Sequence, residues 1–331
     1  MRRLLALLLV ALGLAPGTWW RAPAIAEDER QTLAFVPLEV AAADLGPLEL
    51  AGAWELRSGN RHFGSFSALV ALGDGTLLSA SDSGRMLRFT PPGVSPRIVR
   101  FDYFAGRAQP VKRLADVEAL ALDRDSGRLW AAYEFSNRIE RHERDFASVA
   151  AVAPTAMRTW SANAGPEAMT RLDDGRFIVL AEGAPEWFGE AMPGLLFPAD
   201  PLAGTEPLRF RFVPPDGFRP VDLAQLPDGR VVILLRRVEW RILPGFSAKL
   251  MVADPGQIRE GRAWPAQPVA DLADPLPTDN YEGLAIERDD RGNAVLWVIS
   301  DDNEMALQRT LLLKLVWPAN AKARGIVRAP R

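Results

Sequence analysis

The sequence predicts an all-β fold, a β-propeller of five to six four-stranded antiparallel blades whose ring is closed by pairing of the N- and C-terminal strands. The first observation behind this prediction is a hairpin pattern that recurs about every fifty residues along the chain. The second is the even scatter of proline and glycine, without a serine- and glycine-rich linker, which favours one domain with many turns. The third is the absence of cysteine, so that a buried core must stabilise the chain without disulfides.

Each repeat has the pattern of a β-hairpin with a tight turn in its middle. In the first repeat, a β-type run at 67–69 precedes Asp74 and Gly75, and an apolar run follows at 77–80. Glycine after an acidic residue supplies the positive φ angles that tight hairpin turns require. The continuous apolar second runs indicate strands that are covered on both faces. The later repeats begin at Glu118, Glu167, Asp222 and Glu282.

The two ends of the chain are expected to complete one blade together. Residues 310–317 form a late strand whose repeat is unfinished, and residues 33–39 or 48–56 would supply its missing strands. A sixth blade built partly from residues 27–66 is an alternative. A pair of β-sandwiches with coincidental turns is a second alternative.

The first residues predict export to the periplasm or the exterior. Arg2 and Arg3 precede an apolar run at 4–14, which is too short to span a bilayer and suits a signal peptide cleaved after Ala26. The paired arginines permit twin-arginine export as well as the general route, and an uncleaved N-terminal anchor is the alternative. The predicted organisation is a signal peptide at 1–26 and a single propeller domain at 27–331, with no stable membrane span after cleavage.

The charge of the chain argues against nucleic acid as a partner. Loss of residues 1–26 removes three arginines and no acidic residue, so the formal net charge falls from −3 to −6. A mildly acidic protein lacks the electrostatic footprint of a nucleic-acid-binding protein and favours a cation. Without cysteine, thiolate nucleophiles and cysteine-ligated zinc are excluded.

Acidic residues recur at one phase of the repeats, at the hairpin end opposite each turn. The spacing predicts cross-strand neighbours on one rim of the channel, because the two ends of a hairpin meet there. In the fourth repeat Asp222 meets the region of Arg236 and Arg237 instead. The turn residues Asp74, Asp174 and Asp228 are expected on the opposite rim. The paired rim positions are Ser67 with Asp82, Glu118 with Glu134, Glu167 with Glu182, and Glu282 with Asp301.

Several carboxylates at one mouth would repel one another unless a cation were placed among them. Calcium accepts six to eight oxygen ligands with tolerant geometry, and magnesium or manganese is a lesser alternative. Zinc is disfavoured because the two histidines, His62 and His142, have no partner at ligand spacing. Solvent-facing acids that merely cap turns are the structural alternative. The predicted calcium ligands are Asp82, Glu134, Glu182, Glu282, Asp301 and Asp302.

A metal-activated water is the nucleophile that best suits this residue set. The sequence contains no G-x-S-x-G elbow, P-loop or H-E-x-x-H motif. In this scheme Glu118 or Glu167 removes a proton, while arginine binds a small anionic or ester substrate. The candidate substrate-binding residues are Arg85, Arg113, Arg236 and Arg237.

Five ordered motifs stand at corresponding positions of the repeats: FGSFSAL at 63–69 with SDSG at 81–84, DVEAL at 116–120, NAGPEA at 163–168, DNYEGL at 279–284, and SDDN at 300–303 with QRT at 308–310. Together they resemble the motifs of the phytase-like family described as having esterase-like activity of phytase. The resemblance covers residues from about 48 to 317 and implies a secreted or periplasmic propeller that hydrolyses an ester or phosphoester. The sequence departs from the family pattern at Ala68 and Ala119, which replace glycine, and at Glu304, which replaces an aromatic residue.

Three functions fit these observations. The first is a calcium-assisted hydrolase of phosphate esters or small esters. The second is a non-catalytic propeller that binds a ligand or partner at the same mouth around a structural cation. The third is a lactonase-like metal enzyme, which would share the propeller and its carboxylate ligands.

Overall fold

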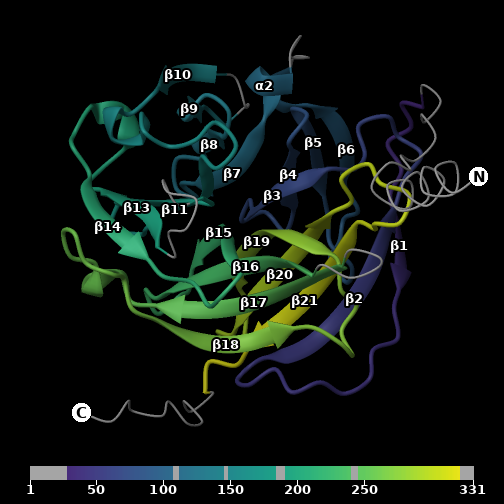
Figure 1. The fold of residues 1–331 in the computed structure, drawn as a ribbon. Helices are drawn as coiled ribbons and strands as arrows, with labels where there is room; N and C mark the ends of the chain where they lie inside the picture. The colour runs from purple at the N-terminus through teal and green to yellow at the C-terminus, as the bar shows by residue number, and fades with distance from the viewer. Residues whose placement is uncertain (1–27, 107–111, 145–147, 184–190, 240–244, 321–331) are drawn as a thin grey trace, which may run out of the picture.

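The computed structural model describes residues 28–106, 112–144, 148–183, 191–239 and 245–320, and it is an all-β propeller of five blades (Figure 1). The predicted signal peptide at 1–26 lies outside the described residues. Five innermost strands surround the channel, and each contacts the next around the whole ring. In order they are β3 (Phe66–Ala71), β7 (Val117–Leu122), β11 (Pro166–Arg171), β15 (Arg219–Gln225) and β19 (Asn280–Arg288), which contacts β3 again. This closed ring confirms the predicted propeller, and the alternative of two β-sandwiches is wrong.

Every blade is an antiparallel sheet, and in blades one to four the strands run outward from the channel in chain order. Short helical turns connect some of the strands. The strands of blades one and two are β3 (Phe66–Ala71), β4 (Leu77–Ser81), β5 (Arg85–Phe89), β6 (Val99–Tyr103), β7 (Val117–Leu122), β8 (Leu129–Tyr133), β9 (Arg138–His142) and β10 (Ser148–Val152). Those of blades three and four are β11 (Pro166–Arg171), β12 (Phe177–Ala181), β13 (Met192–Phe197), β14 (Leu208–Phe212), β15 (Arg219–Gln225), β16 (Val231–Glu239), β17 (Gly245–Ala253) and β18 (Ala266–Leu272). The helical turns are η1 (Phe104–Gly106), α2 (Lys112–Ala115), η2 (Thr155–Met157), η3 (Pro201–Ala203) and η4 (Pro255–Gln257).

Blade five combines both ends of the chain, as the sequence predicts. It contains β19 (Asn280–Arg288), β20 (Ala294–Asp301), β21 (Leu311–Trp317), β2 (Glu49–Arg57) and the additional outer strand β1 (Ala34–Pro37). In Figure 1 the purple β2 lies beside the yellow β21, and Ala53 pairs with Leu313 in their antiparallel register. A sixth blade from residues 27–66 is therefore wrong, because the strands of this segment satisfy the open edge of β21.

The second strands of the blades are buried on both faces over most of their length. All five residues of β4, β8 and β12 are buried, and so is the whole of β20. Two tryptophans of these strands form part of the core: Trp130 contacts Phe177 of blade three at a ring distance of 4.9 Å, and Trp297 is fully buried. Burial of large apolar side chains between blades is the main stabilising term in the fold.

A β-bulge interrupts the innermost strand of every blade near its first residues. A bulge inserts one unpaired residue, re-aims its side chain and increases the local twist. In blade four the bulge falls at Val221, so that Asp222 occupies the register of an alanine or glycine in the other blades. The predicted alignment of Asp222 with the rim acids is therefore wrong by one residue. The bulged residues in chain order are Ser67, Glu118, Glu167, Val221 and Glu282.

Candidate functional site

The second strands end in a ring of charged residues at the channel mouth opposite the hairpin turns. Each of these residues lies opposite a residue two positions before the bulge, so the predicted cross-strand partners are wrong by two positions. The bulge adds one residue to the inner strand and accounts for one of these positions. The other position comes from the hairpin turn, where Ala71, for example, pairs with Leu77. The observed opposite pairs are Asp82 with Ser65, Glu134 with Asp116, Glu182 with Gly165, Arg236 with Arg219, and Asp301 with Asn280.

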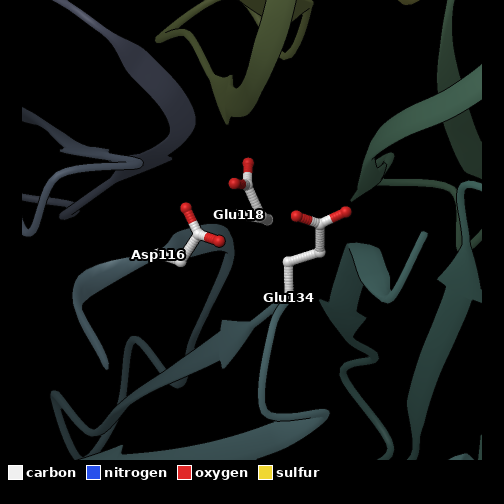
Figure 2. A group of neighbouring side chains, drawn as sticks. All are labelled: Asp116, Glu118 and Glu134. Atoms are coloured by element: carbon white, nitrogen blue, oxygen red, sulfur yellow. The ribbon is translucent and has the colours of Figure 1, made fainter. Parts of the chain in front are cut away.

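Two groups of three carboxylates meet at this mouth. Oxygen atoms of Asp116, Glu118 and Glu134 all lie within 4.8 Å of one another, and Figure 2 shows the three carboxyl groups converging on one space. Glu134, Glu167 and Glu182 form a second group within the same limit. Glu134 therefore belongs to both groups and occupies the centre of the arrangement.

Asp116 was not among the predicted ligands. Asp116 directly precedes the first residue of β7. Its carbonyl oxygen accepts a hydrogen bond from the backbone N–H of Glu134 at 3.2 Å. The available signal in the sequence is its spacing from Glu118, because residues two apart on an extended chain point to the same side.

Three glutamates at the mouth have raised pKa values. Burial raises the pKa of Glu118 well above its ordinary value, and the negative charges of Glu167 and Glu282 raise it further. Burial also raises the pKa of Glu167 well above its ordinary value, and repulsion from the charges of Glu182 and Glu134 raises it further. Burial raises the pKa of Glu134 as well, although a hydrogen bond from Glu167 opposes this effect.

Arg236 carries the positive charge on the other side of the mouth. Its Nη2 donates to Glu182 at 2.6 Å, and its Nη1 donates to Glu282 at 2.7 Å and to the Asn280 side chain at 2.8 Å. Burial opposes the charge of Arg236, but the carboxylates of Glu282 and Glu182 outweigh it and raise its pKa. Burial raises the pKa of Glu282 to about 7, although Arg236 opposes that rise.

The other predicted substrate-binding arginines have different surroundings. Arg85 forms an ion pair with Glu304 and donates from Nε to the Ser83 hydroxyl at 2.7 Å. Arg237 pairs with Glu239 at 2.5 Å. Arg113 belongs to α2, but its side chain lies outside the described part of the structure.

The remaining predicted ligands lie near the end of β20 and beside it. The Asp301 carboxylate accepts the Asn303 backbone N–H at 2.6 Å, and burial raises the Asp301 pKa well above its ordinary value, with Glu282 adding to this effect. Asp302 accepts hydrogen bonds from the Ser65 backbone N–H at 3.0 Å and the Thr310 hydroxyl at 2.8 Å. Asp302 thus ties this loop to blade one.

Asp82 follows β4 at the same mouth. Its charge raises the pKa values of Glu118, Glu282 and Asp301, which places it among carboxylates of blades two and five. Asp82, Glu118, Glu282 and Asp301 therefore meet on one rim, as the phase of the repeats predicts.

Asp222 is buried below the rim. One carboxylate oxygen accepts the Leu223 backbone N–H at 2.7 Å, and the other accepts the Leu284 backbone N–H at 2.6 Å. Burial raises the pKa of Asp222 well above its ordinary value, although both backbone donors oppose the rise. Asp222 therefore joins the innermost strands of blades four and five.

The donor set at the mouth fits a hard divalent cation. It consists of carboxylate oxygens in two groups that share Glu134, which is the ligand type that calcium prefers. The donor set does not fit zinc, because both histidines pack against aromatic rings. The ring centroid of His62 lies 4.5 Å from that of Tyr103, and the ring centroid of His142 lies 5.1 Å from that of Phe104.

The other end of the channel is also hollow. A cavity of about 320 Å³ lies there, lined by residues from all five innermost strands. The turn aspartates Asp74, Asp174 and Asp228 lie at this end and pair with Arg88, Arg176 and Arg230. The predicted separation of turn acids from rim acids is therefore confirmed. Among the described residues, the helices are too short and too polar to traverse a bilayer.

Comparisons with solved structures return proteins of low sequence identity. One is the hydrazine synthase of Kuenenia stuttgartiensis, with 12% identity and a TM-score of 0.39, covering 76% of this chain and 62% of that chain. This chain thus spans less than two thirds of that protein. Another is the WD40 repeats of RRP9, with 10% identity and a TM-score of 0.42, covering 84% of this chain and 100% of that chain. A nidogen/laminin complex gives 10% identity and a TM-score of 0.42, covering 88% and 99% of the two chains.

No curated protein sequence matches the chain. The sequence profile of the phytase-like family, described as esterase-like activity of phytase, matches residues 61–304. This match includes all five innermost strands and both carboxylate groups. The chain therefore belongs to the phytase-like family.

Proposed function

We propose that this protein is an exported hydrolase that cleaves a phosphate ester or small ester with the help of calcium at the acidic mouth of its channel. The observation that carries the proposal is the group formed by Asp116, Glu118 and Glu134, whose oxygens converge within 4.8 Å. A cation that binds among buried carboxyl groups stabilises their charged forms, because it offsets the repulsion and the burial that raise their pKa values. Family membership supports hydrolysis as the class of reaction.

Asp116 and Glu134 are the residues that would hold the cation, with Glu118 beside them. A bound calcium ion supplies positive charge that polarises an ester oxygen and lowers the pKa of water. Positive charge among these groups also lowers the pKa of the neighbouring carboxyls, which makes Glu118 a proton acceptor.

Glu118 and Glu167 would move the protons of the reaction. Glu118 takes a proton from the attacking water, whose oxygen forms the new bond to phosphorus or to the acyl carbon. Glu167 has a raised pKa and hydrogen-bonds to Glu134, so it holds a proton that it can give to the departing ester oxygen. General acid and base residues are most effective when their pKa values lie near the working pH.

Arg236 would set the charge balance of the substrate site. It is held between Glu182 and Glu282, and its guanidinium lies at the same mouth as the carboxylate groups. Arginine matches the oxygens of a phosphate or carboxylate group with paired donors. This position supports an anionic or ester substrate of small size.

The proposal is tested by assaying the purified protein on p-nitrophenyl phosphate, p-nitrophenyl acetate, phytate and a small lactone, in metal-free buffer and with calcium. We expect calcium-dependent turnover of a phosphate or acyl ester that Glu118→Gln reduces about a hundredfold or more. Glu143→Gln is the matched control, because Glu143 is partly exposed and pairs with Arg128 outside the mouth.

Each alternative has its own result in this assay. Calcium binding without turnover of any substrate would replace hydrolysis with a ligand-binding role for the mouth. Opening of the lactone alone would assign a lactonase-like reaction. Equal turnover by Glu118→Gln and the wild type would overturn the proposed site.

Export is a separate part of the proposal, supported by the sequence of residues 1–26. Mass spectrometry of the protein from the periplasm and the culture medium is expected to find a mature chain that begins at Glu27. A full-length chain that fractionates with membranes would instead identify an uncleaved anchor.

A further inference from the structure

A second cavity lies at the turn end of the ring, at the opposite end of the innermost strands from the carboxylate groups. Its volume is about 640 Å³, which is in the size range of small-molecule sites. It shares Leu122 and Arg124 with the cavity on the channel axis. Four arginines and two carboxylates from blades one, two and five line this arginine cavity: Asp74, Arg88, Arg124, Arg144, Glu287 and Arg288.

The arginine cavity has a surplus of positive charge. Arg88 and Asp74 form an ion pair, so their charges cancel. The carboxylate of Glu287 accepts a hydrogen bond from the Trp297 indole at 2.9 Å and is the remaining negative group of the lining. Three arginines therefore face one carboxylate, which leaves two positive charges without a counter-charge in the lining.

These three arginines keep donors that the described protein does not use. Arg124 donates to the backbone carbonyl oxygen of Ile286. In the part of the chain that the structure describes, Arg144 and Arg288 form no ion pair. A guanidinium has five N–H donors, so the cavity lining keeps donors that are accessible to a ligand.

Local structure holds two of the arginines at the cavity. Gly127 has a φ of 74°, and a Cβ atom added there would lie only 2.6 Å from Nε of Arg144. The missing side chain thus lets Arg144 lie across the turn that precedes β8. Arg124 extends from blade two to the backbone of blade five, which fixes one end of its guanidinium. The arginines are therefore placed by the fold rather than scattered over its surface.

We propose that the arginine cavity binds a small molecule that carries two or more phosphate groups. Arginine presents a planar fork that matches phosphate oxygens with paired hydrogen bonds, and the lining contains arginine without lysine. Three arginines from two different blades suit a ligand with separated anionic groups. The cavity shares no residue with the carboxylate groups, so this proposal is independent of the proposed hydrolysis.

Isothermal titration calorimetry with pyrophosphate tests the proposal on the purified protein. The buffer is freed of metal with a resin, because a dissolved polycarboxylate chelator would compete for the cavity. We expect pyrophosphate binding that weakens about tenfold or more in the double variant Arg144→Gln/Arg288→Gln and weakens as salt is added. Both positions are exposed, so the variant should fold.

Two control variants separate this site from other charges. Arg176→Gln removes a turn-end arginine that pairs with Asp174 outside the cavity, and it should leave binding unchanged. Glu118→Gln alters the acidic mouth and should also leave binding unchanged. Wild-type binding that is absent at millimolar pyrophosphate, or that the double variant retains in full, would overturn the proposal. Tighter binding of citrate than of pyrophosphate would overturn the assignment to phosphate groups.

Discussion

Arg236 donates from Nη2 to the carboxylate of Glu182 at 2.6 Å, and this contact joins blade four to blade three. The same guanidinium reaches blade five through Glu282 at 2.7 Å. A single side chain of blade four thus cross-links both neighbouring blades at the channel mouth. The blade whose rim position is basic therefore neutralises part of the acidic ring that the other four blades create.

Replacement of Arg236 should destabilise the protein strongly. The Arg236→Gln variant leaves two partly buried carboxylates without their cation, and removal of one partner from such a buried cluster costs about 3 kcal/mol. Urea unfolding in metal-free buffer measures this loss. Arg176→Gln, which breaks an exposed ion pair, should change the unfolding free energy by less than about 1 kcal/mol. Equal stability of both variants would contradict the cross-linking role.

The stability of the metal-free protein should depend on pH through Glu282. Its folded pKa is about 7, above the ordinary value of 4.5, so the folded state keeps a proton that the unfolded chain has already released. The unfolding free energy therefore falls as pH rises from about 5 to about 7 and levels off above that range. We expect Glu282→Gln to remove roughly 1–3 kcal/mol of this fall.

Urea unfolding at pH 5, 6, 7 and 8 checks this window. Glu143→Gln is the control, because its partly exposed carboxylate should leave the pH dependence of the wild type intact. A Glu282→Gln profile that is parallel to the wild type would show that Glu282 ionises alike in both states.

Loss of one carboxylate oxygen at Asp222 should weaken the junction of blades four and five. Asp222→Asn keeps the size of the side chain but offers one acceptor to two backbone donors, so the N–H of Leu223 or Leu284 becomes unsatisfied. A buried unsatisfied donor costs about 1–3 kcal/mol. Urea unfolding and faster hydrogen exchange at these amides measure the loss, whereas Asp228→Asn in the exposed turn of the same blade should have little effect.

Calcium should raise the melting temperature through Glu134, because this residue belongs to both carboxylate groups. We expect Glu134→Gln to lose most of the calcium-dependent increase in Tm. Asp302→Asn is the informative comparison: it should lower Tm by breaking contacts to Ser65 and Thr310 but keep the response to calcium. Thermal unfolding with and without calcium separates the two effects, and an equal response in Glu134→Gln would argue against this residue as a ligand.

Much of the fold could be predicted because turns and strands leave local signals. Asp74 and Gly75 mark the first turn, and the apolar run after them marks a strand buried on both faces. The number of blades could be predicted only as five or six, because the pairing of residues 49–57 with 311–317 is a contact between distant segments. No local pattern distinguishes that pairing from an additional blade.

The rim was predicted in outline, whereas its register was not. Repeat spacing located Glu118, Glu134 and Glu182 correctly at one end of the ring, but a bulge changes the facing residue without changing the composition of the strand. For this reason the repeat spacing aligns Asp222 with the rim residues. In the structure Val221 occupies the bulge of this blade, and Asp222 lies one position further along the strand. The contacts of Arg236 with two other blades also depend on side-chain reach across the channel, which the spacing in one chain does not encode.

The closure of blade five has a consequence for the order of events during protein synthesis. β2 lacks its partner until β21 has left the ribosome, so the N-terminal strand must wait while four complete blades are made after it. Blades one to four can pair locally as they emerge, but the ring is sealed only after translation ends. A chain that stops before Leu311 would therefore expose the edges of both β2 and β20, which makes truncated products natural targets for aggregation or proteolysis.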